Sequence, residues 1–435
     1  MLVEFTVENF LSFKDSNTLS MVAGALKEFP EYTFSYQPAR AARAKPIQLL
    51  KSVAIYGPNA GGKTNLVKAM EFMRKMVLHS SKDSQAGEGI PYTPFLLNPA
   101  AREAPCTMEV IFVHDHVRYR YGFSTDKDRV RYEWLFAAPK GREAKLFVRE
   151  DHEFDFGKGW IKASGLEEKT RENALFLSVA AQFNQPVATQ VLQWFSNLQV
   201  VMPEHDLPRR SIAFLEKAEQ PERLFEFIRL ADQSISKLGI DEVAYPVSDL
   251  PEFFRDIVLK EKGISSKEEQ NVSMNKLVSH HHAYNDQGER VGQEKFDFSN
   301  ESKGTRRLFY LAGLIFHALD HGSALVVDEL ECSLHPKLTR FIINIFHSKK
   351  VNPKNAQLIF ATHDLSLFSR RFFRRDQLWM VRKNDVGVSE LYALSDFKVR
   401  ADASYDKDYM QGRYGAVPVV NEALGIFVPP PTTIS

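Results

Sequence analysis

The segment Gly57–Thr64, with the sequence GPNAGGKT, constrains the fold of this chain more than any other feature. It matches the pattern G-x-x-x-x-G-K-[ST]. A short apolar run over residues 49–56 predicts a strand before it, and apolar residues at helical spacing over residues 66–78 predict a helix after it. In that context glycines let backbone N–H groups turn inward around phosphates, and the helix amino terminus adds positive charge. We therefore predict a phosphate-binding loop, in preference to a glycine-rich turn that matches by chance.

The residues of this loop have predicted roles. Lys63 is expected to reach the β- and γ-phosphates of a bound nucleotide, and the Thr64 hydroxyl is expected to ligate Mg²⁺. The predicted nucleotide-binding residues are Gly57, Pro58, Asn59, Ala60, Gly61, Gly62, Lys63, Thr64 and Asn65.

Two further segments place polar residues at the ends of apolar strands. Residues 324–327 are apolar and precede Asp328 and Glu329, which we expect to face a cleft because burying an acidic pair is costly. Asp328 is assigned to the Mg²⁺ shell, and Glu329 is assigned as the general base that polarises the attacking water. His363 follows a second strand, over residues 357–362, where a sensor of the γ-phosphate is expected. A lone histidine at such a position would more often be structural.

Taken in order, with a long gap between Lys63 and Asp328, these segments resemble the ATPase heads of the ABC superfamily. More narrowly, they resemble its OLD-like or AAA-type branch, together with the SMC and RecF ATPases. The resemblance covers about residues 1–80 and 291–395. Residues 5–13, with the sequence FTVENFLSF, resemble the start of that branch, and Asn59 fits its form of the phosphate loop. The resemblance implies that the chain binds ATP and Mg²⁺.

The resemblance also implies a signature segment ahead of the acidic strand. Residues 298–308 open a predicted helix and resemble that segment, although the usual Leu-Ser-Gly-Gly-Gln order is altered. In the family this segment binds the γ-phosphate held by the opposite subunit, a task suited to a hydroxyl, backbone N–H groups and a helix amino terminus. A capped helix without a ligand would be favoured if the segment stood alone. The residues assigned to this role are Ser302, Gly304 and Thr305, after Glu301.

The residues after Glu329 narrow the resemblance further. Residues 328–336, DELECSLHP, resemble the OLD-like branch, whereas transporters have aspartate in place of His335. The resemblance places His335 at the dimer interface beside the nucleotide. One expected residue is missing, because the family has a glutamine that contacts Mg²⁺ and the lytic water, and residues 92–99 contain none. Asn98 is the nearest candidate, so a slow or regulated ATPase is the alternative for this site.

The predicted fold is α/β: an ABC-type ATPase head of the P-loop class, with a mixed sheet, an antiparallel β subdomain and a helical insertion. Residues 1–150 are assigned to the first half of the ATPase, with the phosphate loop and a β meander. Residues 151–290 are assigned to a mainly helical insertion or lid, and residues 222–238 to one of its helices. The second half, with signature, acidic strand and sensor histidine, is expected over residues 291–400. A tail over residues 401–435 completes the chain.

Four other segments could suggest a function, and for most of them another explanation is favoured. Consecutive imidazoles at His280–His282 point in different directions, which disfavours a metal site. Asp406 and Asp408 would fit a Toprim nuclease, but too few residues follow the last predicted strand for such a domain. The basic and aromatic run at residues 370–375 is assigned to a helix end with buried Phe, in preference to a nucleic-acid contact. Residues 409–418 resemble the ending of small stand-alone members of this ATPase group.

Composition excludes several classes of protein. Lys plus Arg is 56 and Asp plus Glu is 55, so the formal charge of +1 argues against a surface that coats nucleic acid or an anionic membrane. The two cysteines, Cys106 and Cys332, suit a reducing compartment rather than a disulfide framework. No apolar run reaches the roughly 18 residues of a membrane span, and the amino terminus lacks the layout of a signal peptide. We therefore expect a cytoplasmic protein.

The leading functional prediction is an ATP-binding and ATP-hydrolysing switch that forms a homodimer or higher homo-oligomer through its ATP sites. The resemblance to small bacterial members without a nuclease domain implies a sensor or scaffold for a separate effector, a nuclease or toxin, in phage defence or abortive infection. The rival is a DNA-repair ATPase of the RecF or SMC type that binds DNA directly, which acidic runs such as Glu167–Glu168 and Glu268–Glu269 disfavour. A nucleotide-gated scaffold with weak catalysis is the third hypothesis.

Overall fold

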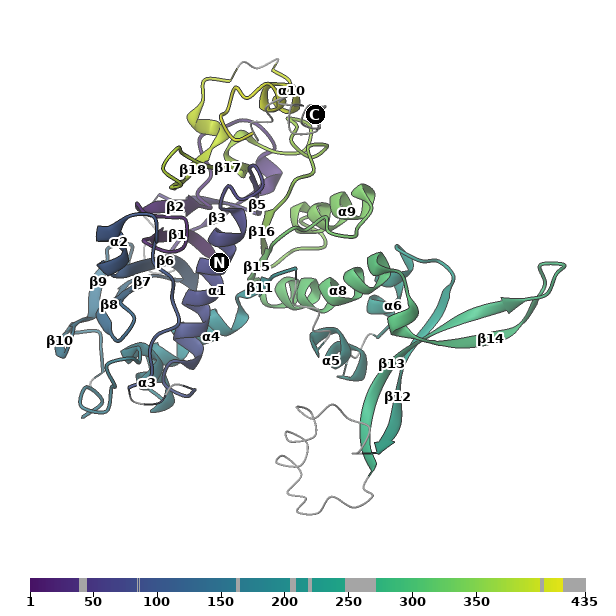
Figure 1. The fold of residues 1–435 in the computed structure, drawn as a ribbon, viewed down its shortest axis with the longest axis horizontal. Coiled ribbons are helices and arrows are strands. Elements are labelled where there is room, and N and C mark those ends of the chain that lie inside the picture. The colour runs from purple at the N-terminus through teal and green to yellow at the C-terminus, as the bar shows by residue number, and fades with distance from the viewer. Residues whose placement is uncertain are drawn as a thin grey trace, which may run out of the picture. The chain divides into compact units, whose positions relative to one another are not determined.

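The phosphate-binding motif lies in the first of two units into which the chain divides. The computed structural model describes residues 1–38, 45–83, 85, 87–161, 165–203, 209–217, 221–246, 271–399 and 403–417. The first unit comprises Met1–Met202, Ala318–Leu330 and Ile342–Ser435, and the second comprises Pro203–His317 and Glu331–Phe341. Segments far apart in the sequence therefore build the first unit together. Its sheets can be followed in Figure 1.

A six-stranded sheet in the first unit carries the strands that precede the predicted site residues. Its order is β11-β15-β16-β5-β17-β18. The first five strands are parallel, and β18 pairs with β17 in the antiparallel sense. Strands β5, β15 and β16 are buried at every residue, as expected for parallel strands covered on both faces. The bounds are β5 Ser52–Tyr56, β11 Gln199–Val201, β15 Ala324–Val327, β16 Gln357–Ala361, β17 Leu378–Lys383 and β18 Ser389–Ala393.

The register of this sheet brings three strand ends to one edge. Val327 of β15 pairs with Phe360 of β16, and Ala361 of β16 pairs with Ile55 of β5. Because parallel strands end at the same edge, the loop after β5, the acidic residues after β15 and the histidine after β16 emerge together. Ligands of open α/β sheets bind outside these carboxyl ends.

The other large sheet of the first unit is antiparallel and has seven strands. Its order is β10-β9-β8-β7-β6-β1-β2, and β6 to β10 follow one another as a meander. A separate antiparallel pair is formed by β3 and β4. The bounds are β1 Leu2–Glu8, β2 Asn17–Ser20, β3 Thr33–Tyr36, β4 Ile47–Leu50, β6 Cys106–His114, β7 Val117–Thr125, β8 Val130–Ala138, β9 Ala144–Glu150 and β10 Glu153–Phe156.

Helix α1 (Lys63–His79) lies in the hydrophobic core that the two large sheets share. Its Phe72 ring lies 5.3 Å from Phe10 and 6.3 Å from Phe123, measured between ring centroids. Trp194 stacks on Phe112 of β6 at 4.1 Å. The helix that follows the phosphate loop is therefore held from several sides. The other helices of the first unit are α2 Pro99–Glu103, α3 Phe176–Gln182, α4 Pro186–Asn197 and α10 Tyr405–Met410.

Polar side chains also join separate chain segments in this unit. Gln357, at the start of β16, accepts a hydrogen bond from Leu2 N at 2.6 Å and donates to the carbonyls of Leu2 and Leu50. At the other end of the chain, the Tyr409 hydroxyl donates to Ala416 O at 2.6 Å, and the Tyr392 hydroxyl donates to Tyr414 O at 2.6 Å. The tyrosines of the tail therefore pack within their own unit.

The second unit combines helices with a three-stranded antiparallel sheet. Ser211 of α5 donates to Phe309 O of α8 at 2.6 Å, and the Arg223 guanidinium of α6 lies 4.2 Å from the Phe316 ring. The sheet order is β12-β13-β14. The bounds are α5 Arg209–Lys217, α6 Pro221–Arg229, β12 Ile235–Pro246, β13 Asn271–Tyr284 and β14 Arg290–Asp297. Helices α8 Lys303–His321 and α9 Pro336–His347 begin in the second unit and end in the first.

The fold class is as predicted, an α/β P-loop fold with an antiparallel β subdomain, and the meander over β6–β9 is confirmed. One local prediction is wrong. The helix expected over residues 222–238 ends at Arg229, and Ile235–Pro246 forms a strand because it pairs along its whole length with β13. Glu268, Glu269 and Pro418 lie outside the described residues.

The two cysteines lie in different surroundings. Cys106 is buried at the start of β6, whereas Cys332, in the second unit, is partly exposed. Burial raises the pKa of the Cys106 thiol well above its usual value. Among the helices of the described residues, none is long and apolar enough to cross a membrane.

A buried ion pair ties the antiparallel sheet to helix α3. The side chains of Glu133 and Arg149 are 0% and 1% exposed, with 3.8 Å between Oε2 and Nη1. Glu133 also accepts hydrogen bonds from the first backbone N–H groups of α3, Phe176 at 2.6 Å and Leu177 at 2.9 Å. Burial raises the pKa of Glu133, and the Arg149 charge and these donors oppose that shift.

We predict that Glu133→Ala lowers the free energy of unfolding by about 3–5 kcal/mol, because Arg149 is left as an uncompensated buried charge. Urea unfolding followed by circular dichroism measures the change. Glu172→Ala is the control, because its side chain is 58% exposed. Equal unfolding midpoints for the two variants would contradict the prediction.

A buried histidine predicts how stability depends on pH. His347 Nε2 lies 2.7 Å from Ser52 Oγ, at the start of β5, and its ring stacks on Tyr32 at 3.8 Å. Burial, with a smaller contribution from the Lys51 charge, lowers the pKa of His347 to about 3. Because the unfolded chain binds the proton more readily, stability falls as the pH drops below the unfolded value of about 6.5.

Between pH 7 and pH 5 this histidine is expected to remove about 2 kcal/mol of stability. The measurement is the urea midpoint at both pH values for the wild type and for His347→Gln. The variant is expected to lose less stability on acidification. An identical pH dependence in the two proteins would rule out this origin.

Candidate functional site

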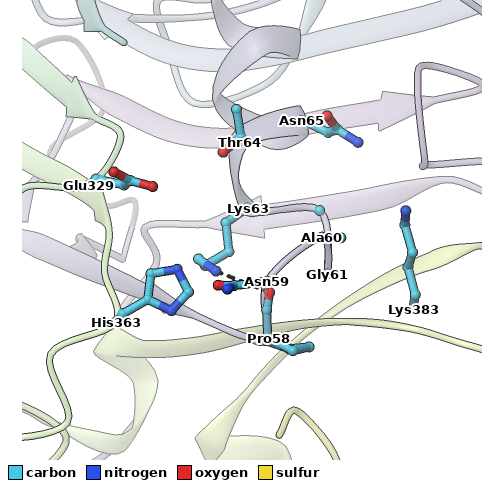
Figure 2. A pocket seen from close by; sticks show the side chains of 11 residues that line it. Pro58, Asn59, Ala60, Gly61, Lys63, Thr64, Asn65, Glu329, His363 and Lys383 are labelled. Carbon is cyan, nitrogen blue, oxygen red and sulfur yellow. Dashed lines mark hydrogen bonds between the residues drawn. The ribbon is translucent and has the colours of Figure 1, made fainter. Parts of the chain in front are cut away.

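A pocket of about 460 Å³ opens over the phosphate-binding loop in the first unit (Figure 2). Its volume lies in the usual range for small-molecule sites. Glu329, His363 and the loop itself line it, so the ends of β5, β15 and β16 all contribute. The full lining consists of Pro58, Asn59, Ala60, Gly61, Gly62, Lys63, Thr64, Asn65, Glu329, His363 and Lys383.

The loop passes so close to its neighbours that side chains are excluded at two glycines. A Cβ on Gly57 would lie 2.2 Å from Val381 O of β17. A Cβ on Gly62 would lie 2.4 Å from Ser389 Oγ, and Gly62 also has a φ of +122°, which L residues rarely adopt. These positions therefore require glycine for the course of the backbone.

Hydrogen bonds from two distant segments hold the loop. Ser389 Oγ, on β18, donates to Gly61 O at 2.7 Å and lies within hydrogen-bond distance of Ser12 Oγ, also at 2.7 Å. Ser12 Oγ in turn accepts from Asn65 Nδ2 at 2.7 Å, and Ser389 N donates to Ser12 O at 2.7 Å. The loop is therefore held by β18 and by the turn that contains Ser12. Sequence analysis assigned neither serine a role, although Ser12 belongs to the run FTVENFLSF.

The same run contains a turn that Asn9 holds. Asn9 has a φ of +51°. Its side-chain amide donates to the carbonyls of Ala101 and Ala104, both at 2.8 Å, and its carbonyl accepts from Phe95 N at 3.1 Å. Since an asparagine tolerates this backbone region and can satisfy several backbone groups, its role in the run is structural.

Lys63 folds back over the loop from the first residue of α1. Its Nζ donates to Gly57 O at 2.9 Å and to Pro58 O at 3.2 Å, and the residue is 6% exposed. Thr64 follows it and lines the pocket. A cation held over a ring of backbone groups, at the start of a helix, is suited to bind phosphate.

The two acidic residues that follow β15, Asp328 and Glu329, lie in different surroundings. Glu329 lines the pocket and has a φ of +51°, an uncommon backbone conformation for a residue other than glycine. Asp328 is 1% exposed, its backbone N–H donates to Val201 O at 2.9 Å, and it is not among the residues that line the pocket. The turn at Glu329 therefore aims one carboxylate into the pocket. Backbone strain of this kind is common at functional sites.

His363 enters the pocket from the end of β16. The preceding residue, Thr362, is buried, and its backbone N–H donates to Ile55 O at 3.0 Å, which continues the pairing of β16 with β5 beyond the strand. Figure 2 shows His363 and Glu329 on the same side of the loop as Lys63.

Lys383 is a lining residue that sequence analysis missed. It ends β17, the strand that pairs with β5 on the side away from β16. Figure 2 shows it across the loop from Glu329 and His363. The pattern that could have found it is the parallel strand itself, because the ends of all strands beside the phosphate loop reach the same edge.

The predicted signature residues lie in the second unit, at the start of α8. Ser302 Oγ accepts from Thr305 N at 3.1 Å and lies 2.8 Å from Thr305 Oγ1, so it caps the helix. A Cβ on Gly304 would lie 2.8 Å from Ser333 O, so glycine allows this close approach. His335 caps α9 in the same unit, where its Nδ1 accepts from Lys337 N at 3.2 Å.

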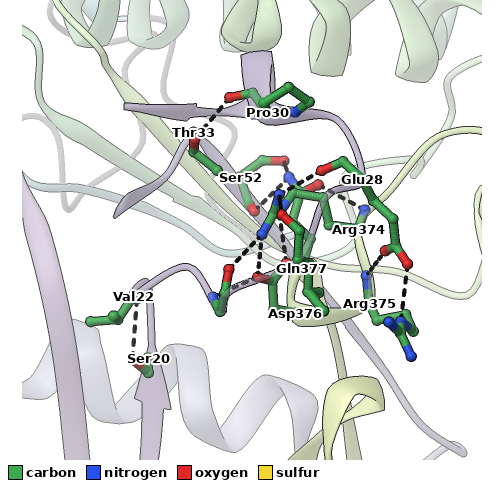
Figure 3. A network of polar contacts seen from close by, with 12 residues as sticks. Ser20, Val22, Glu28, Pro30, Thr33, Ser52, Arg374, Arg375, Asp376 and Gln377 are labelled. Carbon is green, nitrogen blue, oxygen red and sulfur yellow. Dashed lines mark hydrogen bonds and ion pairs between the residues drawn. The ribbon is translucent and has the colours of Figure 1, made fainter. Parts of the chain in front are cut away.

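Asn98 and the basic run at residues 370–375, both considered for a functional role, form hydrogen bonds that hold the fold. Asn98, the candidate for the missing glutamine, caps α2 through Ala101 N at 3.0 Å and is not among the residues lining the pocket. In the basic run at residues 370–375, the buried Arg374 bonds to Asp376 and donates to the carbonyls of Gly24 and Glu28, while Arg375 pairs with the Glu28 carboxylate at 3.1 Å (Figure 3). These arginines therefore hold the early loop rather than presenting a free basic surface.

The donors of the pocket fit a nucleoside triphosphate with a divalent cation. Backbone N–H groups at a glycine-rich turn, the Lys63 ammonium and the amino end of α1 suit the phosphates. Oxygen ligands are those that Mg²⁺ prefers, and Thr64 supplies a hydroxyl beside the pocket. Glu329 adds a carboxylate on which an attacking water can be oriented.

Comparisons with solved structures give distant resemblances. The chain is similar to a structure described as the SMC head bound to the C-winged helix domain of ScpA, with 13% identity, 90% of this chain and 97% of that chain covered, and a TM-score of 0.41. It is also similar to an SMC head domain from Thermotoga maritima, with 14% identity, 90% and 98% coverage, and a TM-score of 0.37. No curated protein matches the chain.

A family model matches residues 52–369, which is most of the chain and includes the phosphate loop, the acidic pair and His363. The model carries the description "AAA domain, putative AbiEii toxin, Type IV TA system". With its P-loop, its parallel sheet and this match over more than half of its length, the chain belongs to that AAA-domain family.

Proposed function

We propose that the protein is an ATP-binding and ATP-hydrolysing switch. The observation that carries the proposal is the pocket in which the phosphate-binding loop meets a strained Glu329 and His363 at one edge of the sheet. Membership of an AAA-domain family supports the same activity.

Within one subunit, each residue has a distinct task. The loop residues 57–65 surround the phosphates, and Lys63 binds the β- and γ-phosphates. Thr64 and Asp328 would hold Mg²⁺, which would neutralise charge on the phosphates. Glu329 accepts a proton from the attacking water, and His363 contacts the γ-phosphate.

The second half of the site comes from another subunit. Ser302, Gly304 and Thr305 present a hydroxyl and backbone N–H groups at the start of α8, which suits the γ-phosphate bound by a partner. His335 lies at the same interface. Two subunits therefore enclose two ATP molecules, and hydrolysis of the ATP allows the subunits to separate. The absence of a glutamine in residues 92–99 and the structural role of Asn98 agree with slow or regulated turnover.

The biological output is control of a separate effector, a toxin or nuclease, in bacterial antiviral defence. The family description names a toxin–antitoxin system, in which two components act together, and this supports a protein partner. The alternative, a DNA-repair ATPase that binds DNA directly, is less well supported because Arg374 and Arg375 are engaged within the chain.

We predict that Glu329→Gln lowers ATP hydrolysis by at least about 100-fold and retains ATP binding, because a general base is lost and the phosphate contacts remain. Phosphate release and titration with a fluorescent ATP analogue measure the two properties. Size-exclusion chromatography with ATP is expected to show a stable dimer.

Lys63→Ala is the companion variant and is expected to lose ATP binding. Turnover by Glu329→Gln at the wild-type rate would show that the general base lies elsewhere. Binding by Lys63→Ala as tight as that of the wild type would show that the site itself is misplaced.

We also predict that Lys383→Ala weakens ATP binding by about three- to tenfold, or about 0.7–1.4 kcal/mol, because the pocket loses a cation beside the loop. Lys350→Ala, at an exposed position outside the pocket lining, is the control. The same analogue titration at two salt concentrations measures the effect, which is expected to shrink at high salt. Unchanged affinity at low salt would exclude Lys383 from the site.

A further inference from the structure

The signature segment is held from one side by the sheet β12-β13-β14 of the second unit. Glu301 directly precedes Ser302, and its Oε1 accepts a hydrogen bond from Ser279 Oγ and lies 2.7 Å from His281 Nε2. Ser279 and His281 are two residues apart on β13, so both point to the same face of the sheet. The Glu301 carboxylate is therefore clamped by one strand.

His281 is itself fixed by groups on its other side. Its Nδ1 lies 3.0 Å from Ser234 Oγ, whose hydroxyl donates to Asp232 Oδ1 at 2.6 Å. An oxygen atom therefore lies beside each ring nitrogen, Ser234 Oγ at Nδ1 and Glu301 Oε1 at Nε2. The Phe296 ring packs edge-on against the imidazole at 5.0 Å. These contacts fix the orientation of the His281 ring independently of its contact with Glu301.

The central pair in this chain of contacts, His281 and Glu301, is largely shielded from water. The side chains of His281 and Glu301 are 18% and 8% exposed. A charge-assisted hydrogen bond in such surroundings is stronger than one on an open surface, because solvent competes less. Residues that follow Glu301 have little room to shift independently, since Ser302 caps α8 and Ser333 O leaves no space for even a Cβ at Gly304. The position of Glu301 therefore determines that of the segment Ser302–Thr305.

We propose that His281 and Ser279 are positioning residues for the signature segment. They hold Glu301 so that Ser302 and Gly304 face the γ-phosphate bound by a second subunit, which ties ATP-dependent dimerisation to the β12–β14 sheet. This inference rests on the proposed function. It also accounts for one residue of the run His280–His282 without a metal.

The test uses full-length protein carrying Glu329→Gln, in which ATP is bound and not hydrolysed. Two quantities are measured: the dissociation constant of the ATP-bound dimer by analytical ultracentrifugation, and the affinity of the protein for a fluorescent ATP analogue under dilute, monomeric conditions. His281→Ala is expected to weaken the dimer by about tenfold or more, and to leave the analogue affinity within about twofold of the parent. Ser279→Ala is expected to weaken the dimer in the same direction.

Two further variants separate positioning from general damage. His281→Gln keeps an N–H donor near Glu301 and is expected to recover part of the dimer affinity. His280→Ala is the matched control, because the neighbouring side chain points to the opposite face of the strand. Equal dimer affinity in His281→Ala and the parent would overturn the inference, as would a parallel loss of dimer affinity, analogue affinity and melting temperature. If the Glu329→Gln parent binds the analogue and does not dimerise with ATP, the proposed trans site fails, and the inference falls with it.

Discussion

The hydroxyl of Ser389 is the contact on which the ATP pocket depends most directly. It bonds to Gly61 O and to Ser12 Oγ, and thereby joins the phosphate loop, the turn after β1 and strand β18. Asn65 completes the group from the first turn of α1. A phosphate-binding loop contributes most when its N–H groups are already directed inward, because no reorganisation is then needed on binding. Gly62 can follow this course only because it has no side chain to meet Ser389.

The residues assigned to ATP binding are distributed over both units of the chain, and those of the two units are assigned to different ATP molecules. The loop, the acidic pair and His363 belong to the first, and the residues assigned to the partner's γ-phosphate belong to the second. The chain passes from the first unit to the second between Leu330 and Glu331, one residue after Glu329. The switch proposed above would therefore have separate parts for binding nucleotide and for responding to it. The clamp on Glu301 lies wholly within the responding part.

Most residues that line the pocket were predictable because their spacing and flanking strands are local patterns. The loop, Glu329 and His363 each follow an apolar strand, and the parallel register brings them together. The roles of Ser389 and Ser12 were not predictable, since they depend on which segments become neighbours in space. The helical period over residues 222–238 failed for a similar reason: pairing with β13 overrides a weak local preference. The contact between His281 and Glu301 arises between segments that no local pattern connects.

Because the two cysteines lie in unequal surroundings, one of them can be labelled selectively. Burial keeps the Cys106 thiol protonated and out of reach of reagents, because the thiolate is the reactive form. Cys332 is accessible and adjoins Ser333, whose carbonyl meets Gly304. A thiol-directed fluorophore will therefore attach beside the signature segment of the natural sequence. The chain thus carries its own position for a spectroscopic reporter that can test the proposed closure of two subunits.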